Sequence, residues 1–564
     1  MNKNNELAKL RDVFEKWEKE HSEEFSHERK RQFSSGDEIP IKRVYTPLEL
    51  EEKGFDYLKD LGFPGEYPYT RGISPTMYRG QLWGISHYSG YPTPELSNQL
   101  WKRQIAGGGN LAYIAYDLAT QLGYDPDHPK AEGEVGRVGV SMSSLRDWEI
   151  AFDGIDISKI TISQVLNGPA IIGIASHLAL AQQRGIDFKE LKGVCQNEIL
   201  KEYYARGNYI FPPEPALRLT TDALYYCGKY VPNYQAIQVS SYHPAERGAN
   251  PIHEAAFALA DAFAHIQSAT DRGMDVDTIA PTIQFLTGHQ HVGFFQEIAK
   301  LRAMRKIYAR VLKERFRAQN PESMKARWYS AIMGTSLHRE QYLNNIGRIT
   351  LSALAGALAG CQVIDSRAYD EAFGIPTDEA IMQSIRCQHV VAQETGVTDT
   401  VDPLAGSYFV EWLTSEYEER IDKEVKIIDE MGGMVKAIER GYVQRVAAGD
   451  AYKWQKKFES KEIVRVGVNY LPSEVEERPP RIYRADPKVE AERIAAIKEL
   501  KRNRDNQTVK TTLERVTEVA RMEPTPANNL MLPVLEAVNS YATVGEICSA
   551  LREVWGEYVE PLIL

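Results

Sequence analysis

Four short runs of sequence carry the fold: KITISQVLN at residues 159–167, LKGVCQ at 191–196, QAIQVSSYH at 235–243 and TIAPTIQFL at 278–286. Each run is rich in β-branched or other apolar residues, and each is followed by a longer segment with helical periodicity. This alternation predicts parallel β/α units, whose functional side chains lie beyond the carboxyl ends of the strands. Four polar residues stand at or beyond those ends: Gln196, Arg206, Tyr242 and His243. We therefore expect them to face one mouth of a barrel.

Composition limits the class of protein. The chain has 564 residues, 43% of them hydrophobic, which is enough for one large domain with smaller terminal regions. Its net charge of −11 argues against nucleic-acid binding as the main role. The N-terminus lacks an apolar signal core and no segment approaches membrane-spanning length, so we expect a cytoplasmic protein that binds no membrane. The five cysteines form no CxxC pair, which argues against a disulfide framework or structural zinc.

The chain divides into three parts. Residues 1–45 are charged with helical periodicity, which indicates a helical arm that lies on a neighbour or partner. Residues 46–415 alternate strand and helix patterns, and the near-continuous apolar strands are typical of a sheet buried on both faces, as in a barrel or a doubly wound sheet. Residues 416–564 are mainly helical, with a Pro- and Glu-rich connector at 471–487 that suits a linker or docking segment.

Several longer motifs resemble one known family. They are YPYTRGISPTMYRGQLWG at 67–84, LGYDPDHP at 122–129, GEVGRVGV at 133–140, QNEILKEYYARGNYIFPPEP at 196–215, SYH at 241–243, RAYDEAFGIPTDEA at 367–380 and ETGVTDTVDPLAGSYFVEWLT at 394–414. In this order they resemble the large, substrate-binding chain of the coenzyme B12-dependent methylmalonyl-CoA mutase family, which includes isobutyryl-CoA and 2-hydroxyisobutyryl-CoA mutases. The resemblance covers roughly residues 40–430 and is weaker beyond them. It implies a (β/α)8 TIM barrel threaded by the pantetheine arm of the substrate and capped at its carboxyl mouth by cobalamin.

The resemblance also implies a partner. Single-chain members of the family carry a C-terminal cobalamin-binding domain with an Asp-x-His-x-x-Gly motif, and this motif is absent from the sequence. The chain is therefore similar to the large subunit of a split mutase, in which a separate small subunit binds most of the adenosylcobalamin within a heterotetramer. A barrel without any cofactor remains an alternative.

The resemblance assigns catalytic roles to four residues: Tyr88, Gln196, Tyr242 and His243. His243 would hydrogen-bond the acyl carbonyl of the substrate and polarise it, which a neutral imidazole or its cation can do. Tyr242 and Gln196 would line the same pocket. The cofactor would supply the radical chemistry, so the protein would bind, orient and shield the substrate. Outside the motif context, His243 is interpreted as a satisfied strand-end histidine and Gln196 as an amide bonded to loop backbone.

Arg206 and Tyr88 narrow the substrate. In the family, an arginine at the position of Arg206 pairs bidentately with a free carboxylate, at a strength that neutral groups do not reach. Tyr88 matches the tyrosine of methylmalonyl-type enzymes. Together they favour a carboxylate-bearing acyl group of the methylmalonyl-CoA/succinyl-CoA type, although a surface salt bridge is the structural alternative for Arg206. The resemblance places four more residues on the substrate: Thr76, Met77, Ser163 and Asn167.

Other positions depart from the family's coenzyme A contacts: Gln81, Gly84, Ser86, Tyr113, Val165 and Thr282. The family has arginine, threonine or a small hydroxyl residue there, and Ser74 likewise replaces a usual tyrosine. Losing several of these groups should weaken coenzyme A binding, because phosphate recognition depends on charge-assisted hydrogen bonds. Either the chain holds the carrier differently or its substrate lacks the usual carrier. Tyr113 could fill part of the tunnel.

The resemblance assigns four residues to the cofactor: Tyr116, Asp117, Glu246 and Glu371. Glu371 would accept hydrogen bonds from the hydroxyls of the adenosine ribose. Its surroundings differ from the family, with Ala331 in place of an amide and Arg367 in place of asparagine. No metal site is predicted, because His289 and His291 stand two apart without a third ligand and suit a polar pocket lining better.

Three hypotheses follow from the sequence. The leading one is the catalytic large subunit of an adenosylcobalamin-dependent acyl-CoA mutase, an isomerase that rearranges the carbon skeleton of a carboxylate-bearing acyl group or of a different branched or non-CoA acid. The second is a non-catalytic chain of a heteromeric mutase, against which the joint presence of Arg206, Gln196 and His243 speaks. The third is a barrel enzyme of unrelated chemistry, or a binding protein.

Overall fold

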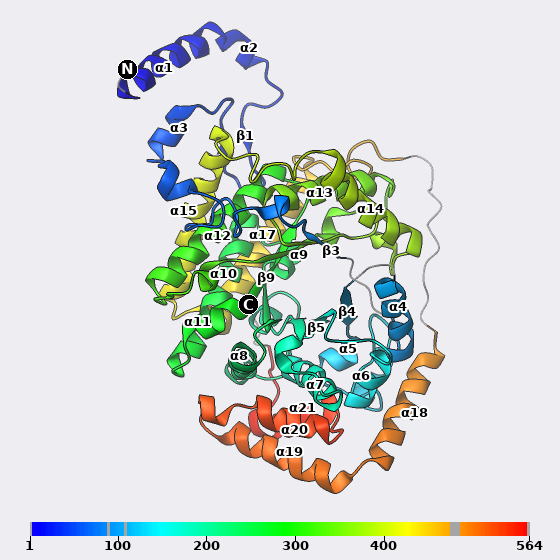
Figure 1. Cartoon of the computed structure of the whole chain (residues 1–564). Coiled ribbons are helices and arrows are strands. Elements are labelled where there is room, and N and C mark those ends of the chain that lie inside the picture. Colours follow the sequence, from blue (N-terminus) through cyan, green and yellow to red (C-terminus); the bar gives the residue numbers. More distant parts are fainter. Residues whose placement is uncertain (1–2, 87–90, 107–109, 474–485, 561–564) are drawn as a thin grey trace.

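The computed structural model describes residues 3–86, 91–106, 110–473 and 486–560 (Figure 1). Two parallel sheets form its centre, with strand orders β4-β5-β6-β7 and β3-β11-β10-β9-β8. Their strands are β3 (Gly84–Ser86), β4 (Leu111–Ala115), β5 (Thr161–Val165), β6 (Lys192–Cys195), β7 (Tyr234–Gln235), β8 (Ile237–Ser240), β9 (Ile283–His289), β10 (Trp328–Ile332) and β11 (Val363–Asp365). A parallel arrangement requires crossover connections, which the intervening helices supply.

The two sheets are continuous at one edge. Ala236 alone separates β7 from β8, so the chain passes directly from one sheet into the other. The amide of Gln238 in β8 also donates to the carbonyl of Gln196 at the end of β6, at 2.8 Å. No ladder among the described residues joins β3 to β4. The predicted parallel strands with alternating helices are confirmed, whereas closure of these strands into a complete barrel stays a prediction.

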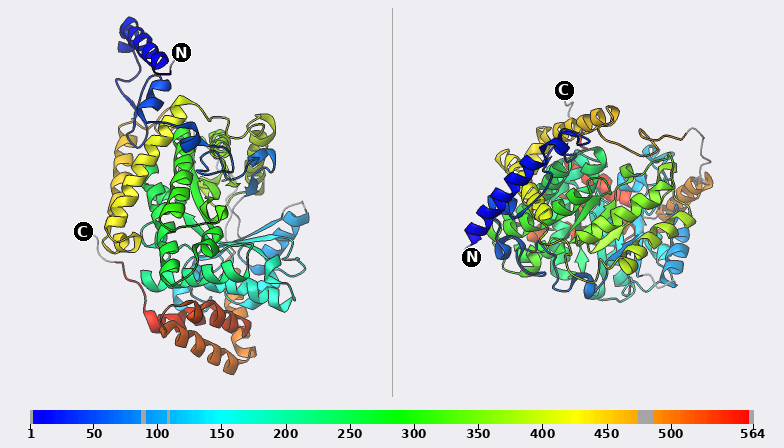
Figure 2. Two further views of the ribbon diagram at one scale, coloured as in Figure 1. Left: turned by 60° about the vertical axis from the view of Figure 1, so that its left-hand side comes forward. Right: turned by 90° about the horizontal axis from the view of Figure 1, so that it is seen from above.

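Helices follow the strands and cover their outer side (Figures 1 and 2). They are α4 (Pro94–Ala106), α5 (Leu118–Gln121), α6 (Leu145–Ala151), α7 (Ala170–Gln183), α8 (Pro213–Tyr230), α9 (Tyr242–Arg247), α10 (Pro251–Asp271), α11 (Val276–Ile279), α12 (Phe294–Glu314), α13 (Asn344–Leu358) and α14 (Asp378–Glu394). Local sequence fixes their starts. The Asn250 side chain caps α10 by accepting from the amides of Ile252 and His253, with Pro251 in the first helical position.

Neighbouring residues of one strand belong to two different cores. Ile114, Phe285 and Trp328 lie in the main core, which the sheets form with the helices. Tyr113 and Leu286, their neighbours along the chain, lie in a separate cluster. Because side chains alternate across a strand, each sheet has an outer face against the helices and an inner face, on which residues of the two sheets meet.

The N-terminal arm projects from the two sheets and their helices, whereas the helices that begin the C-terminal region pack against them. Helices α1 (Lys3–Glu20) and α2 (Ser22–Ser26) stand out from the body in Figure 1 and in the left view of Figure 2. The small β1 (Phe33–Ser34) and β2 (Pro40–Ile41) pair and α3 (Pro47–Glu52) follow them. A contact of this arm with a partner stays a prediction. The expected boundary at 415/416 falls within α15 (Tyr408–Glu430), which packs on α10 and α12. The helical region is thus continuous with the β/α part.

The remaining helices are α16 (Met434–Glu439), α17 (Tyr442–Glu459), α18 (Lys488–Asn503), α19 (Asn506–Arg521), α20 (Met531–Asn539) and α21 (Val544–Trp555). Helices α18 to α21 form a separate layer beside α7 and α8 (Figure 1). Most of the predicted connector, residues 474–485, lies outside the described residues. None of the helices that the structure describes combines the length and the apolar character needed to cross a bilayer.

Candidate active site

The carboxyl ends of the strands bring most of the predicted residues to one face, here called the carboxyl mouth. Asn167 follows β5, Gln196 follows β6, and His243 lies in the first turn of α9 directly after β8. The Asn167 amide nitrogen donates to Gln196 Oε1 at 3.1 Å, which ties the ends of β5 and β6 together. Gln196 is only 3% exposed. These contacts come from strand ends that parallel sheets place side by side.

His243 is held as a neutral imidazole. Burial, followed by the positive charges of Lys201, Arg206 and Arg367, keeps the pKa of His243 well below its usual range. Its Nδ1 lies 2.7 Å from Ser240 Oγ, which also accepts the main-chain amide of His243 at 3.3 Å. A hydroxyl that accepts from this amide can donate to Nδ1, which favours the tautomer with the ring proton on Nε2. The imidazole can then act as a neutral hydrogen-bond donor.

A buried carboxylate, Glu202, organises the basic groups of the mouth. It accepts from Lys201 Nζ, from Asn167 Nδ2 at 2.8 Å and from the Asn208 amide at 2.9 Å. Burial by itself would raise the pKa of Glu202, but Lys201 and Arg206 outweigh it and hold the pKa below its usual value. Glu202 is therefore charged and fully paired, and it fixes the neighbouring cations in place.

Arg206 reaches the mouth from this anchor. Its Nη1 lies 3.5 Å from Glu202 Oε1, and its side chain is 25% exposed. That long contact is the one ion pair of Arg206 among the described residues, and the guanidinium lies near enough to His243 to help lower the pKa of that imidazole. A guanidinium held in this way presents a planar set of donors that fits a carboxylate. Binding of a substrate carboxylate by Arg206 stays a prediction, and the contact with Glu202 is the ion pair that the structure shows.

Tyr242 and Arg367 form the opposite rim. Arg367 Nη2 donates to the Tyr242 hydroxyl at 3.1 Å, and its guanidinium carbon lies 5.5 Å from the centre of the Tyr242 ring. Arg367 also lies 3.3 Å from Asp365 Oδ2 and 4.0 Å from Glu371 Oε1. Burial raises the pKa of the Tyr242 phenol, so this group stays protonated. The rim thus combines an aromatic ring, one cation and two carboxylates.

Two of the four residues predicted for the cofactor, Glu371 and Glu246, lie at this rim. Burial raises the pKa of Glu371 above its ordinary value. Glu246, on α9, accepts from the amides of Gly334 at 2.5 Å and Thr335 at 3.1 Å, and so bridges the end of β8 to the loop after β10. A cavity of about 420 Å³ adjoins Glu246. Their contact with a cofactor stays a prediction.

The other two, Tyr116 and Asp117, are turned into the protein. The Tyr116 hydroxyl donates to Gln164 Oε1 at 2.9 Å on the outer face of the sheet, and Tyr116 is 1% exposed. Asp117 is fully buried, caps α5 through the Thr120 amide and accepts from the Gly136 amide at 2.8 Å. Burial raises the pKa of Asp117 to about 6. Both side chains are buried and engaged in hydrogen bonds within the protein, although both residues follow the carboxyl end of β4.

This placement makes a testable prediction for Tyr116. Tyr116→Phe is expected to lower the free energy of unfolding by about 1 kcal/mol, because a buried hydrogen bond to Gln164 is lost. Binding of a corrinoid should not change. Urea denaturation and corrinoid binding by the complete complex measure the two effects, with the half-exposed Tyr408→Phe as control. Weaker corrinoid binding at unchanged stability would instead support the predicted contact of Tyr116 with the cofactor.

Three residues predicted for the substrate lie away from the mouth. Ser163 is on the inner face of β5, opposite Tyr113 in the β4–β5 ladder. Met77 contacts Gly360 at the turn that precedes β11, and Thr76 is exposed beside it. Thr76 and Met77 therefore lie at the amino ends of the strands, at the opposite end from His243. Tyr88 lies outside the described residues.

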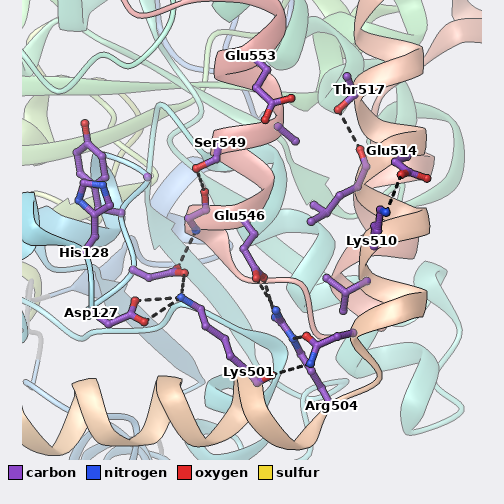
Figure 3. A pocket seen from close by; sticks show the side chains of 18 of the residues that line it. Asp127, His128, Lys501, Arg504, Lys510, Glu514, Thr517, Glu546, Ser549 and Glu553 are labelled. Atoms are coloured by element: carbon purple, nitrogen blue, oxygen red, sulfur yellow. Dashed lines mark hydrogen bonds and ion pairs between the residues drawn. The ribbon is translucent and has the colours of Figure 1, made fainter.

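The largest cavity described, of about 970 Å³, is elsewhere (Figure 3). It lies between α19, α21 and the segment after α5. Several of its charged side chains are paired with one another: Lys501 lies 2.9 Å from Asp125 and 3.0 Å from Asp127, and Arg504 donates to Glu546 at 2.7 Å. None of the predicted site residues lines it. It is therefore not the candidate active site.

No group of three metal-ligating side chains occurs in the described ranges. His289 lies on the outer face of β9 with Nδ1 2.5 Å from Ser330 Oγ, and burial lowers the pKa of His289 to about 3. Burial, aided by Arg465 and Arg348, lowers the pKa of His291 to about 4. The two rings belong to different surroundings.

Sequence analysis missed four residues that shape the mouth: Lys201, Glu202, Ser240 and Asp365. Lys201 and Glu202 lie within the 196–215 motif, five and four residues before Arg206. This spacing could have indicated that they contact Arg206. Ser240 stands three residues before His243, a spacing that permits a side-chain bond across a strand–helix turn. Nothing in the sequence distinguishes Asp365 from an ordinary strand-end carboxylate.

Comparisons with known proteins identify the family of the chain. The profile of the methylmalonyl-CoA mutase family matches residues 34–557. The chain is 39% identical over 533 residues to the 2-hydroxyisobutanoyl-CoA mutase large subunit of Aquincola tertiaricarbonis, covering 94% of each chain. It is 37% identical over 521 residues to methylmalonyl-CoA mutase of Rhizobium meliloti, covering 92% of this chain and 72% of that one. By these matches, the chain belongs to the methylmalonyl-CoA mutase family.

Proposed function

We propose that this chain is the substrate-binding large subunit of an adenosylcobalamin-dependent mutase, a cytoplasmic isomerase that rearranges the carbon skeleton of a carboxylate-bearing acyl group. The relatives named above are methylmalonyl-CoA and 2-hydroxyisobutanoyl-CoA mutases, which makes the methylmalonyl-CoA/succinyl-CoA type the reference substrate. The observation that carries the proposal is the convergence of the Arg206 guanidinium, neutral His243 and Gln196 on one mouth. In this proposal the parallel strands form a (β/α)8 barrel.

Arg206 binds the free carboxylate. Its position next to Lys201 and Glu202 gives a fixed, partly exposed guanidinium in a region of positive potential. Lys201 and Arg367 are further cations near His243, and after burial they help to lower the pKa of that imidazole. Because the mouth also holds the carboxyl groups of Glu202, Asp365 and Glu371, the guanidinium of Arg206 is the group that would bind the acid, rather than a uniformly positive lining. The acid is thereby oriented before any reaction begins.

His243 and Gln196 hold the acyl carbonyl. The Nε2–H tautomer set by Ser240 donates one hydrogen bond to the carbonyl oxygen, and the Gln196 amide lies beside it on β6. A donor fixed in a desolvated site stabilises charge that develops on the oxygen more strongly than it would in water. Because His243 is neutral, it polarises the carbonyl without transferring a proton. Tyr242 covers the rim and restricts access of water.

The rim residues fit the cofactor on which this family depends. Asp365 Oδ1 is buried without a hydrogen-bond partner among the described residues, and the Glu371 carboxyl lies beside it with a raised pKa. Such carboxyl oxygens suit the hydroxyl donors of an adenosine ribose. Asp365 and Glu371 would therefore hold the adenosyl group, with Arg367 fixing both carboxylates. When bound, adenosylcobalamin supplies the radical chemistry that removes hydrogen from an unactivated carbon.

The remaining surface of the corrinoid is assigned to a separate small subunit. The Aquincola relative, matched over 94% of its length, is named as a large subunit. A heterotetramer of two large and two small chains is the assembly that we propose by this similarity. The half-buried face around Glu246, with its adjoining cavity, lies beside the mouth that such a subunit would cover.

Reconstitution tests the proposal. The purified chain is combined with the small cobalamin-binding protein encoded nearest to its gene, with adenosylcobalamin, and with succinyl-CoA or a short dicarboxylic acid as probes. Isomer formation followed by mass spectrometry is expected only when all components are present. Omission of adenosylcobalamin or of the small protein serves as the control. If no corrinoid-carrying protein associates with the chain and no probe is converted, the proposal is contradicted.

A further inference from the structure

Four basic side chains gather beyond the carboxyl ends of β9 and β10. They are His291, His338, Arg348 and Arg465, here called the arginine–histidine cluster. His291 follows β9, His338 follows the short turn after β10, Arg348 lies in α13, and Arg465 follows α17. Each arginine lies near enough to both histidines to lower the pKa of their imidazoles. Segments far apart in the sequence thus bring four basic groups into one region.

The two arginines of the cluster are buried without a carboxylate. Each is 7% exposed. Arg348 donates from Nη1 to Asn345 Oδ1 and from Nη2 to the Val466 carbonyl, both at 2.7 Å. Arg465 donates from Nη1 to the Val464 carbonyl at 3.1 Å, whereas its Nε is buried without a hydrogen-bond partner among the described residues. Burial, followed by the like charge of Arg348, lowers the pKa of Arg465.

Other buried arginines of the chain have carboxylate partners. Arg302 lies 2.8 Å from Glu411, and Arg367 lies 3.3 Å from Asp365. Such pairing is the rule, because a buried charge is costly unless a counter-charge compensates it. Within the described ranges, the chain supplies no carboxylate partner of this kind to Arg348 or Arg465.

The two histidines add unused hydrogen-bonding atoms. His291 Nδ1 and His338 Nε2 are buried, and neither has a hydrogen-bond partner in the part of the chain that the structure describes. Burial and then the two arginines lower the pKa of each imidazole to about 4. The exposed Glu340 acts on His338 alone, and its effect is the smallest. An anion beside these rings would reverse the effect of the arginines and favour protonated, donating imidazoles.

A cavity gives access to the cluster. The cavity of about 420 Å³ that adjoins Glu246 also reaches Arg465, between Gln290 after β9 and Met333 after β10. The carboxylates on its other walls have partners of their own: Asp37 with Ser35, Glu38 with Lys457, Asp450 with His253, Glu246 with the amides of Gly334 and Thr335, and both Glu254 and Glu297 with Lys300. These pairs leave the guanidinium of Arg465 without competition from the cavity's own anions.

Asn345 connects the cluster to the rim of the carboxyl mouth. This fully buried amide accepts from Arg348 and donates to the carbonyls of His338, at 2.8 Å, and Tyr369, at 2.9 Å. Tyr369 lies in the segment between Arg367 and Glu371. A ligand that fixed Arg348 and His338 would therefore also hold the rim segment.

We infer that the arginine–histidine cluster binds a divalent oxyanion of the phosphate class. Two guanidinium groups and two imidazoles offer charged and polar donors from four segments, and the planar donor set of arginine matches phosphate oxygens. A phosphate group carries a charge of about −1.5 to −2 at pH 7, which balances the two arginines. The inference concerns a site outside the proposed reaction, and binding to the chain alone tests it.

Isothermal titration of the purified full chain with inorganic phosphate measures this binding. Ionic strength is held constant with sodium chloride, and acetate serves as a monovalent comparison. Saturable binding of phosphate with a dissociation constant of about 1 mM or below is expected. Acetate should bind about tenfold more weakly, since it balances only one of the two charges. No saturation by phosphate, or equal binding of acetate, would overturn the inference.

The source of the phosphate group is distinguished in the same titration. Glycerol 3-phosphate replaces inorganic phosphate as a small monoester. Tighter binding of the monoester would support the inference with a phosphorylated metabolite as ligand, whereas tighter binding of inorganic phosphate would support it with the free ion.

Variants test the residues. Arg465→Gln should weaken phosphate binding about tenfold or more, because it removes a charge and the donors of a guanidinium. The control Arg502→Gln removes an exposed arginine of α18 and should leave the dissociation constant unchanged. Thermal melting checks that each variant is folded, and His291→Asn, with an expected loss of about threefold or more, repeats the test if Arg465→Gln unfolds. Wild-type affinity in the folded variants would contradict the assignment.

Hydrogen–deuterium exchange locates the ion. Phosphate should slow exchange at residues 463–469 and 338–346, which carry or adjoin the cluster, because bound ligand suppresses local opening. Protection confined to the layer of α18 to α21, where Lys501 and Arg504 also lie, would place the ion elsewhere and contradict the inference.

Discussion

Arg206→Gln is expected to lower kcat/KM for a dicarboxylate-derived substrate by about a hundredfold or more, because truncating one partner of a desolvated charge pair costs about 2–5 kcal/mol. The amide retains hydrogen bonding but loses the charge and the paired donors. Glu202 would keep Lys201 as its partner, so the fold should tolerate the change. Initial rates on a dicarboxylate and on its uncharged monocarboxylate analogue measure the effect.

The preference between these two substrates should shift toward the uncharged analogue. Arg502→Gln is the matched control, because Arg502 is an exposed arginine in the last turn of α18, in the layer beside α7 and α8. It should leave kcat/KM within about twofold, since surface charges away from the site contribute little. Unchanged kinetics of Arg206→Gln on a dicarboxylate would contradict the substrate assignment. An equal loss of kcat/KM in both variants would show that the loss is a general effect of charge and not of a contact with the carboxylate.

Much of the architecture was predictable because strand runs and helical periodicity are local. The runs at 159–167 and 191–196 contain β5 and β6 with small errors at their ends. The run at 278–286 was less accurate: residues up to 282 are helical, and β9 extends from Ile283 to His289. Pro281 explains the difference, since proline favours the start of a helical turn and lacks the amide that a strand needs.

The sequence predicted which residues lie at the carboxyl ends of the strands, but not the face of the sheet to which each side chain points. Gln196 and His243 lie at the mouth because any residue at the carboxyl end of these strands does so. Tyr116 follows β4 in the same way, yet its ring is on the outer face with Gln164. Inner and outer faces alternate residue by residue, so an error of one position in register reverses the side chain. That register depends on ladders between strands far apart in the sequence.

The partners of the site residues could be predicted even less. Glu202 anchors Arg206, and Ser240 orients His243, through contacts whose geometry depends on the turn after each strand. The cluster of side chains between the two sheets could not be predicted from the sequence for the same reason. Tyr113 and Leu286 are separated by 173 positions, and only folding brings them together. The sequence shows that a tyrosine, Tyr113, replaces the small residue of the family. How much of the space between the sheets its ring fills depends on the side chains of the other sheet that pack against it.

His243→Ala is expected to lower kcat by about 10²–10³-fold, the usual cost of removing a donor aimed at developing negative charge in a desolvated site. KM should change by less than about threefold, because the carboxylate clamp at Arg206 supplies most of the ground-state binding. Steady-state kinetics of the reconstituted complex separate the two parameters. An equal loss in kcat and in affinity would show that His243 only positions the substrate.

The protonation state of His243 gives a second, independent test. Since burial and three neighbouring cations hold the pKa of His243 well below 6.5, the imidazole is neutral at pH 6 and above. The pH profile of kcat/KM should therefore show no inflection from this group between about pH 6 and 8. Ser240→Ala removes the hydroxyl at Nδ1 and should lower kcat by about tenfold through loss of the Nε2–H tautomer, while Ser240→Thr, which keeps the hydroxyl, should recover most of it. A rise of kcat/KM with a midpoint near pH 6.5 in the wild type, lost in His243→Ala, would instead identify an imidazole that titrates in the working range and would contradict the neutral donor.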